Sequence, residues 1–185
     1  MERMERERDR RAWRESGKLE RLFYGGPSFG VLHEEYAKRG RIDERAPVKA
    51  SGEIRIEAPV ERVWALLRDL RGWERWAPGV HDVRLDSAVA VDAGFSWSIG
   101  RTRIKSVLAV VDPARELTWT GAALWTKAVD RHVLEPTEDG ATRLCIEESL
   151  AGALVPLLFS RAKLEVQHQR WLAALKAVAE GGVAR

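Results

Sequence analysis

The feature that most constrains the fold is a row of strand-like segments joined by very short links. Turn residues separate several of them, including Asp112-Pro113 and Glu138-Asp139-Gly140. Consecutive strands with short links favour an antiparallel meander, because parallel neighbours need a long crossover connection. The six segments predicted as strands are Val80–Val91, Gly94–Ile99, Arg101–Val111, Glu116–Trp125, Lys127–Pro136 and Thr142–Leu150.

A further strand and three helices flank this row. Residues Ser51–Glu57 alternate isoleucine with charged residues, which predicts a half-buried strand. Apolar residues at helical spacing follow over Val60–Asp69, and a second short helix is predicted over Gly72–Trp76. The last element is a long amphipathic helix, Ala153–Ala179, in which Pro156 fits the first turn or a kink. This order predicts an α+β domain in which a seven-stranded, curved antiparallel sheet surrounds a long C-terminal helix.

The first 49 residues differ in composition and are predicted to be an extension (1–49) that precedes the main domain (50–181). Met1–Leu22 alternates arginine with glutamate at i,i+4 spacing, which predicts a solvated helix. The aromatic cluster from Phe23 to Tyr36 needs a surface against which to bury. It packs either on its own domain or on the mate in a homodimer, or it covers the mouth of a pocket as a lid. Residues Arg39–Lys49 are polar and typical of a linker.

Charge and composition exclude several classes of protein. Lys and Arg number 31 against 28 Asp and Glu, and a net charge of +3 is too balanced to predict a nucleic-acid-binding surface. No stretch reaches the roughly 20 apolar residues of a membrane-spanning helix, and no apolar signal segment is visible, so we expect a cytoplasmic protein without membrane insertion. Cys145 is the single cysteine, and the histidines show no metal-ligand spacing. The sequence therefore predicts neither a metal nor a cofactor.

Several short motifs between Ala50 and Glu180 carry a family resemblance. They are Ile54-Arg-Ile-Glu-Ala-Pro-Val-Glu-Arg-Val-Trp64, Trp73-Glu-Arg-Trp-Ala-Pro78, Leu117-Thr-Trp-Thr-Gly121, Arg131-His-Val-Leu-Glu-Pro-Thr137, and Gly140-Ala-Thr-Arg-Leu144 with Glu147-Glu148. In these motifs the chain resembles the START/Bet v 1-like (SRPBCC) superfamily, in particular its bacterial polyketide cyclase/dehydrase branch. The resemblance implies a helix-grip fold that encloses a mostly apolar pocket for a lipid, polyketide, sterol or other small hydrophobic molecule. It does not select an activity, because this fold hosts binders, carriers, cyclases and hydrolases alike.

Strand alternation predicts which side chains face such a pocket, since residues i and i+2 share one face of a strand. The expected inner rows are rich in aromatic and aliphatic residues, and tryptophans would hold a planar conjugated ligand by stacking. Ser106 belongs to the more apolar row of its strand. The predicted ligand-binding residues are Trp76, Phe95, Trp97, Ser106, Trp119, Trp125, Leu134, Ile146 and Phe159.

Two titratable residues in the inner rows are the candidate catalytic pair. His132 can act as a general acid or base near neutral pH, and an enclosed Glu148 can hold or deliver a proton. Such a pair could abstract a proton α to a ketone or protonate a leaving hydroxyl, the steps of an aldol cyclisation followed by dehydration. Alternatively, His132 is a satisfied interior residue, and Glu148 pairs with Arg103 or Arg84. A β-bulge would turn Glu147 inward in place of Glu148.

Two functions from different classes follow. The first is a cofactor-independent, polyketide cyclase/dehydratase-like enzyme. The second is a non-catalytic protein that binds or transports a hydrophobic ligand or lipid. The chain has two tyrosines, both in the extension, so the pocket lacks the phenol groups of the aromatase branch. Their absence weighs against the enzyme and keeps both functions open.

Overall fold

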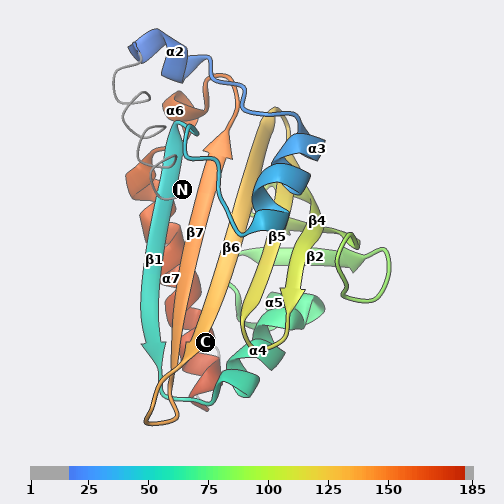
Figure 1. The fold of residues 1–185 in the computed structure, drawn as a ribbon, viewed down its shortest axis with the longest axis vertical. Helices are drawn as coiled ribbons and strands as arrows, with labels where there is room; N and C mark the ends of the chain where they lie inside the picture. Colours follow the sequence, from blue (N-terminus) through green and yellow to red (C-terminus); the bar gives the residue numbers. More distant parts are fainter. Residues whose placement is uncertain (1–16, 182–185) are drawn as a thin grey trace.

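The computed structural model describes residues 17–181, and within them seven strands form one antiparallel sheet (Figure 1). The strand order is β1-β7-β6-β5-β4-β3-β2, so every neighbouring pair except β1 and β7 is consecutive along the chain. The strands are β1 (Val48–Ile56), β2 (Val80–Leu85), β3 (Gly94–Ile99), β4 (Thr102–Asp112), β5 (Glu116–Ala123), β6 (Thr126–Pro136) and β7 (Thr142–Ala151). The antiparallel meander predicted from the short links is therefore confirmed.

Helices between β1 and β2 and at the end of the chain pack on one face of the sheet. The long helix α7 (Arg161–Ala179) lies behind the sheet in Figure 1 and contacts β1. Helices α4 (Val60–Arg68) and α5 (Trp73–Trp76), joined by a 3-10 turn η3 (Leu70–Gly72), also contact α7. This arrangement of a curved sheet around a terminal helix is the expected helix-grip fold. No helix in residues 17–181 is long and apolar enough to cross a membrane.

Two strands depart from the simple alternation that the sequence predicts. β2 ends at Leu85 rather than Val91, and a loop leads from it to β3. In β4 the pairing register with β5 shifts between Leu108 and Val110. This irregularity places Ala109 in the outer cluster and Val111 against the main core, so the inner row that contains Leu108 continues at Val111 rather than at Val110.

The C-terminal helix is interrupted where the sequence predicts one continuous element. A short helix α6 (Val155–Leu158) is followed by extended backbone at Phe159 and Ser160, and α7 begins only at Arg161. The Ser160 hydroxyl accepts a hydrogen bond from the backbone N–H of Lys163 at 3.2 Å. This side-chain cap satisfies a free N–H group at the start of α7 and thereby favours a new helix at this residue.

One tryptophan, Trp73, occupies the centre of the main core. It is fully buried, and its ring centroid lies 6.1 Å from Trp97, 5.3 Å from Trp119 and 5.1 Å from Trp171. The indole N–H donates a hydrogen bond of 2.9 Å to the carbonyl oxygen of Leu67, so its polar atom is satisfied. These aromatic rings fill the space between the sheet and α7 beside α5.

From α3 (Phe29–Val31) onward the extension packs on the face of the sheet opposite to α7, whereas α2 (Lys18–Leu22) lies beside α6 at one end of the sheet (Figure 1). The extension also contains a π-helical turn η1 (Leu32–Tyr36) and a 3-10 turn η2 (Ala37–Arg39). Leu32 and Ala37 are buried against Ala109 of β4 and Val129 of β6. These residues therefore pack on their own domain. The helix predicted over Met1–Leu22 lies mostly outside the described residues, which include only its last turn, α2.

A buried aspartate holds the predicted linker against the sheet. Asp43 is 1% exposed, and its backbone N–H donates a hydrogen bond of 3.1 Å to the Ser149 hydroxyl of β7. The Tyr24 hydroxyl donates to the Asp43 carboxylate at 3.1 Å. The polar residues before β1 thus form an ordered connection rather than a solvated spacer.

Candidate functional site

A cavity of about 560 Å³ lies between the sheet and the break that separates α6 from α7. Its walls come from β3 and β4 with the turn between them, from β5, β6 and β7, and from α6 and the first two turns of α7. Large apolar side chains in the lining include Trp97, Ile104, Trp119, Trp125, Leu158, Phe159 and Leu164. Most of this lining is apolar, which is the usual character of a small-molecule site.

The position of the cavity follows from side-chain size. Near α5 the tryptophan cluster around Trp73 fills the interior. Further along β5 and β6 the inner wall carries only small residues, including Gly121, Ala123 and Ala128. The gap at Phe159 and Ser160 also leaves this end of the sheet without a continuous helix above it. Small residues below and a helix break above leave a hollow that the atoms of residues 17–181 do not fill.

The structure brings some of the predicted ligand-binding residues together and separates others. Trp97, Trp119, Trp125 and Phe159 line the cavity, as does Glu148. The remaining predicted residues lie outside its lining, in the packed part of the interior or at its edge. They are Trp76, Phe95, Ser106, Leu134 and Ile146.

Each of these five has a packing partner that explains its position. The ring of Trp76 lies 4.9 Å from that of Trp171, and Phe95 meets Trp73 edge-on at 6.0 Å. The Ser106 hydroxyl accepts a hydrogen bond of 3.2 Å from the Trp97 indole N–H. Leu134 and Ile146, at most 2% exposed, belong to the main core. The inner-face assignment placed the four strand residues on the correct side of the sheet, where packed side chains rather than empty space surround them.

Two carboxyl groups form the polar part of the cavity wall. Asp130 of β6 and Glu148 of β7 are paired directly across the two strands and both line the cavity. His168 of α7 reaches the same point from the opposite side, and its Nε2 lies 2.9 Å from the Glu148 Oε2 atom, a hydrogen-bond distance. The cavity is thus apolar over most of its surface and carries a cluster of titratable groups at one place.

Burial makes Asp130 an unusual acid. Loss of solvent raises the pKa of its carboxyl group well above the ordinary value, and the neighbouring Glu148 raises it further. Its Oδ1 atom is buried and accepts no hydrogen bond within the described residues. The His132 Nδ1 atom lies 3.3 Å away, but without the alignment of a hydrogen bond. Asp130 therefore holds its proton more strongly than a surface aspartate, and its buried Oδ1 atom lies next to His132.

His132, the predicted acid or base, lies behind the cavity wall. It is 2% exposed, is not part of the cavity lining, and stacks on Trp119 with a centroid distance of 4.9 Å. Burial, together with the nearby His168, lowers the pKa of its imidazole from 6.5 to about 3. The ring is therefore neutral at physiological pH, and it packs against Trp119, which lines the cavity.

Two members of the polar cluster, Asp130 and His168, escaped the sequence prediction although signals for both were present. Asp130 is two residues before His132, so strand alternation places it on the same inner face. His168 lies on the row of α7 that contains the buried residues Leu164 and Leu175. Each signal shows which face of the strand or helix the residue lies on. Whether a cavity lies next to that face depends on how the side chains of several elements pack together.

The neighbours of Glu148 also decide between the sequence alternatives. Its partner is His168 rather than Arg103, which donates a hydrogen bond to Ser96. Glu147 faces the outer side and forms an ion pair of 2.8 Å with Arg131, so β7 keeps its predicted alternation. Within residues 17–181, the cavity wall does not bring together three side chains spaced to ligate a metal ion.

The mouth of the cavity carries an unusual number of exposed apolar side chains. In the β5–β6 turn Leu124 is 83% exposed and Trp125 is 52% exposed. Opposite this turn, Leu157 and Leu158 of α6 are also more than half exposed. Leu124, Trp125 and Leu158 line the cavity as well, so an apolar surface continues from the interior to the outside.

A family model described as "Polyketide cyclase / dehydrase and lipid transport" matches residues 47–180. No curated protein sequence matches the chain. Among solved structures, the hypothetical protein jhp0584 from Helicobacter pylori is 17% identical, with a TM-score of 0.66 over 73% of this chain and 89% of that one.

Two further structures show the same fold. DynU16, a protein in the dynemicin biosynthetic locus, is 18% identical with a TM-score of 0.59. The aligned region covers 74% of this chain and 49% of DynU16. The Aha1 dimer from Colwellia psychrerythraea is 18% identical with a TM-score of 0.59, covering 73% of this chain and 98% of the other. At these identities the likeness establishes a common fold.

Proposed function

We propose, since this chain belongs to the polyketide cyclase/dehydrase and lipid transport family, that its cavity binds a hydrophobic, conjugated small molecule and promotes proton transfer on it. Residues 50–181 would form the binding unit, and residues 1–49 an extension that stabilises it from outside. The observation that carries the proposal is the pair of carboxyl groups, Asp130 and Glu148, side by side on the wall of an otherwise apolar cavity.

The shape and composition of the cavity favour a flat ligand with one polar end. The indole rings of Trp97, Trp119 and Trp125 offer surfaces for stacking a conjugated system. A ligand carbonyl or hydroxyl oxygen placed against Asp130 would accept a hydrogen bond from its protonated carboxyl group.

The two carboxyl groups have different surroundings, which suits them to opposite roles in acid–base chemistry. Asp130 would donate its proton to the carbonyl oxygen of a bound ketone, while the Glu148 carboxylate accepts a proton from the neighbouring carbon. The product is an enol, and the reverse transfers restore the ketone. His168 would orient the Glu148 carboxylate through their 2.9 Å contact. Enolisation of this kind begins an aldol cyclisation and requires no cofactor.

Exchange of deuterium into 2-tetralone, a flat bicyclic ketone with acidic α-protons, tests this chemistry without knowledge of the natural substrate. In deuterated buffer the protein should accelerate loss of the α-proton signals in the NMR spectrum. Glu148→Gln should remove the acceleration because an amide cannot accept the proton, and Asp130→Asn should reduce it. His132→Phe should retain it, because His132 does not reach the cavity. Exchange at the buffer rate with 2-tetralone demonstrably bound would refute the catalytic role.

A specific observation also supports the second function, a carrier without chemistry. The exposed apolar residues Leu124, Trp125, Leu157 and Leu158 at the cavity mouth provide a continuous apolar path by which a ligand could enter or leave. If 2-tetralone binds saturably without exchange, the carrier function is favoured. In that case Asp130 and Glu148 would serve to orient the polar end of the ligand.

A further inference from the structure

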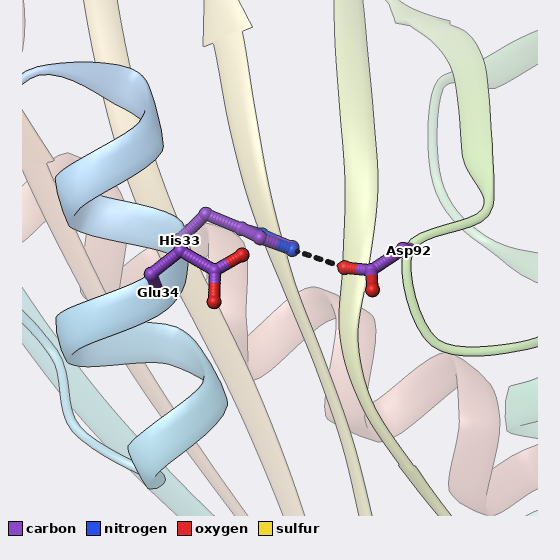
Figure 2. Close-up of side chains that lie close together, drawn as sticks. All are labelled: His33, Glu34 and Asp92. Carbon is purple, nitrogen blue, oxygen red and sulfur yellow. Dashed lines mark hydrogen bonds and ion pairs between the residues drawn. The ribbon is translucent and has the colours of Figure 1, made fainter.

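A second cluster of polar residues lies on the outer face of the sheet, where the extension meets the loop between β2 and β3. His33 and Glu34 come from η1, and Asp92 comes from the loop (Figure 2). One ligating atom from each residue lies within 4.8 Å of the other two. Figure 2 shows the imidazole and the Glu34 carboxylate both directed toward the Asp92 side of the helix. The proposed function uses none of these residues.

We propose that His33, Glu34 and Asp92 form a site for a divalent transition-metal ion such as Zn²⁺, which competes with the Lys38 ammonium group for the same position. An imidazole nitrogen and two carboxylate oxygens are a donor set that zinc accepts, and three protein ligands leave room for water as the fourth. The site would join the extension to the β2–β3 loop.

The position of Lys38 shows that these oxygens already stabilise a positive charge. Its Nζ atom lies 2.7 Å from Asp92 Oδ1 and 2.8 Å from Glu34 Oε1. The lysine side chain is long, flexible and partly exposed, so it can move into solvent and leave its place to an ion.

The imidazole of His33 is held in an orientation suitable for a metal ligand. The residue is 5% exposed, and its Nδ1 atom lies 2.7 Å from the Thr120 hydroxyl oxygen of β5. Its other nitrogen, Nε2, points to Asp92 Oδ1 at 2.9 Å. Metal-bound histidines commonly donate the N–H of their second nitrogen to a neighbouring oxygen, which fixes the ring. Thr120 provides that oxygen, and Nε2 would release its proton to bind the ion.

The remaining ligands need only small movements. Ligand atoms around a tetrahedral zinc ion lie about 3.3 Å apart when each bond is about 2.0 Å long. Nε2 of His33 and the Asp92 oxygen are already closer than this, so the Glu34 side chain, which is half-exposed, would move toward them. The backbone N–H of Asp92 donates a hydrogen bond of 2.8 Å to the Leu108 carbonyl oxygen, which anchors the loop on β4.

Calorimetric titration of the full chain with ZnCl₂ tests the proposal. The wild-type protein should bind one ion saturably. Lys38→Met should bind it about fivefold more tightly, because a competing positive charge is removed from direct contact with two ligands. His33→Gln should weaken binding at least about tenfold, since mutation of even an outer-shell partner costs that much in known sites. His81→Gln is the matched control, because His81 also contacts an aspartate, Asp82, but lies outside the cluster.

The Lys38 variant keeps the test decisive even if His33→Gln folds poorly, because Lys38 is at the surface and its replacement is expected to increase affinity. Unchanged or weaker zinc binding by Lys38→Met would overturn the proposal. The same conclusion would follow if the wild type bound no zinc, or if His81→Gln lost binding while His33→Gln retained it. None of these outcomes bears on the cavity, which lies on the other face of the sheet.

Discussion

Replacement of His132 by phenylalanine should remove a large part of the acid sensitivity of the protein. The pKa of His132 is about 3 in the folded chain, against 6.5 for an ordinary histidine. Between these values the unfolded chain binds a proton that the folded chain cannot bind, so folding stability falls as the pH falls from 6.5 toward 3. Each pH unit in this range costs about 1.4 kcal/mol, which amounts to about 3 kcal/mol at pH 4.

Phenylalanine suits the site because it keeps the stacking contact with Trp119 and gives up no hydrogen bond. Neither ring nitrogen of His132 has a hydrogen-bond partner among the described residues. The variant should therefore equal or exceed the wild type in stability at pH 7, and should be about 3 kcal/mol more stable than it at pH 4.

Urea unfolding followed by tryptophan fluorescence, at intervals from pH 7 to pH 4, measures both proteins directly. His81→Gln is the control: His81 is exposed, and its hydrogen bond to the Gly100 carbonyl oxygen raises its pKa, so its contribution has the opposite sign. If the stabilities of wild type and His132→Phe fall in parallel from pH 7 to pH 4, burial does not keep His132 neutral and the reasoning fails.

Two further substitutions test the polar wall and the extension. Asp130→Asn should stabilise the protein at pH 7, because the raised pKa of Asp130 means that the wild type loses stability as the pH rises above about 4. In urea titrations the unfolding free energies of the two proteins should converge toward pH 4. A difference that stays constant with pH would contradict this. Leu32→Ala should cost about 2–5 kcal/mol in the same assay if the extension is part of the folded unit, whereas Val31→Ala, its half-exposed neighbour, should cost much less. Equal, small losses would make the extension a passive tail.

The fold was predictable because its determinants are local. Turn residues such as Asp112-Pro113 end one strand and begin the next, and alternation of apolar residues identifies the inner face of each strand. Because consecutive strands joined by short links pair as antiparallel neighbours, few sheet topologies remain possible. Local rules failed where the backbone departs from regularity: at Val110, where one irregularity reverses the alternation, and at Ser160, where a side-chain cap restarts the helix.

The candidate site was less predictable because a cavity is a property of several elements at once. The sequence placed Ile146 and Leu134 on the inner face, and they lie there, but no pattern shows whether the space beside them is filled. Trp73 fills it at one end of the sheet, while Gly121 and Ala128 leave it open at the other. The approach of His33 to Asp92 depends on how the extension lies on the sheet, which periodicity does not encode.

The central claim, that the hollow beside Asp130 accepts a guest molecule, is tested most directly by titration with the apolar dye Nile red, monitored by dye fluorescence. The wild type should bind one dye molecule per chain saturably. Ala128→Trp places an indole in the cavity, so it should abolish dye binding while retaining the wild-type unfolding transition. Ala88→Trp, the control, lies in the exposed β2–β3 loop and should bind the dye as the wild type does. Absence of saturable binding to the wild type, or undiminished binding to Ala128→Trp, would contradict the account.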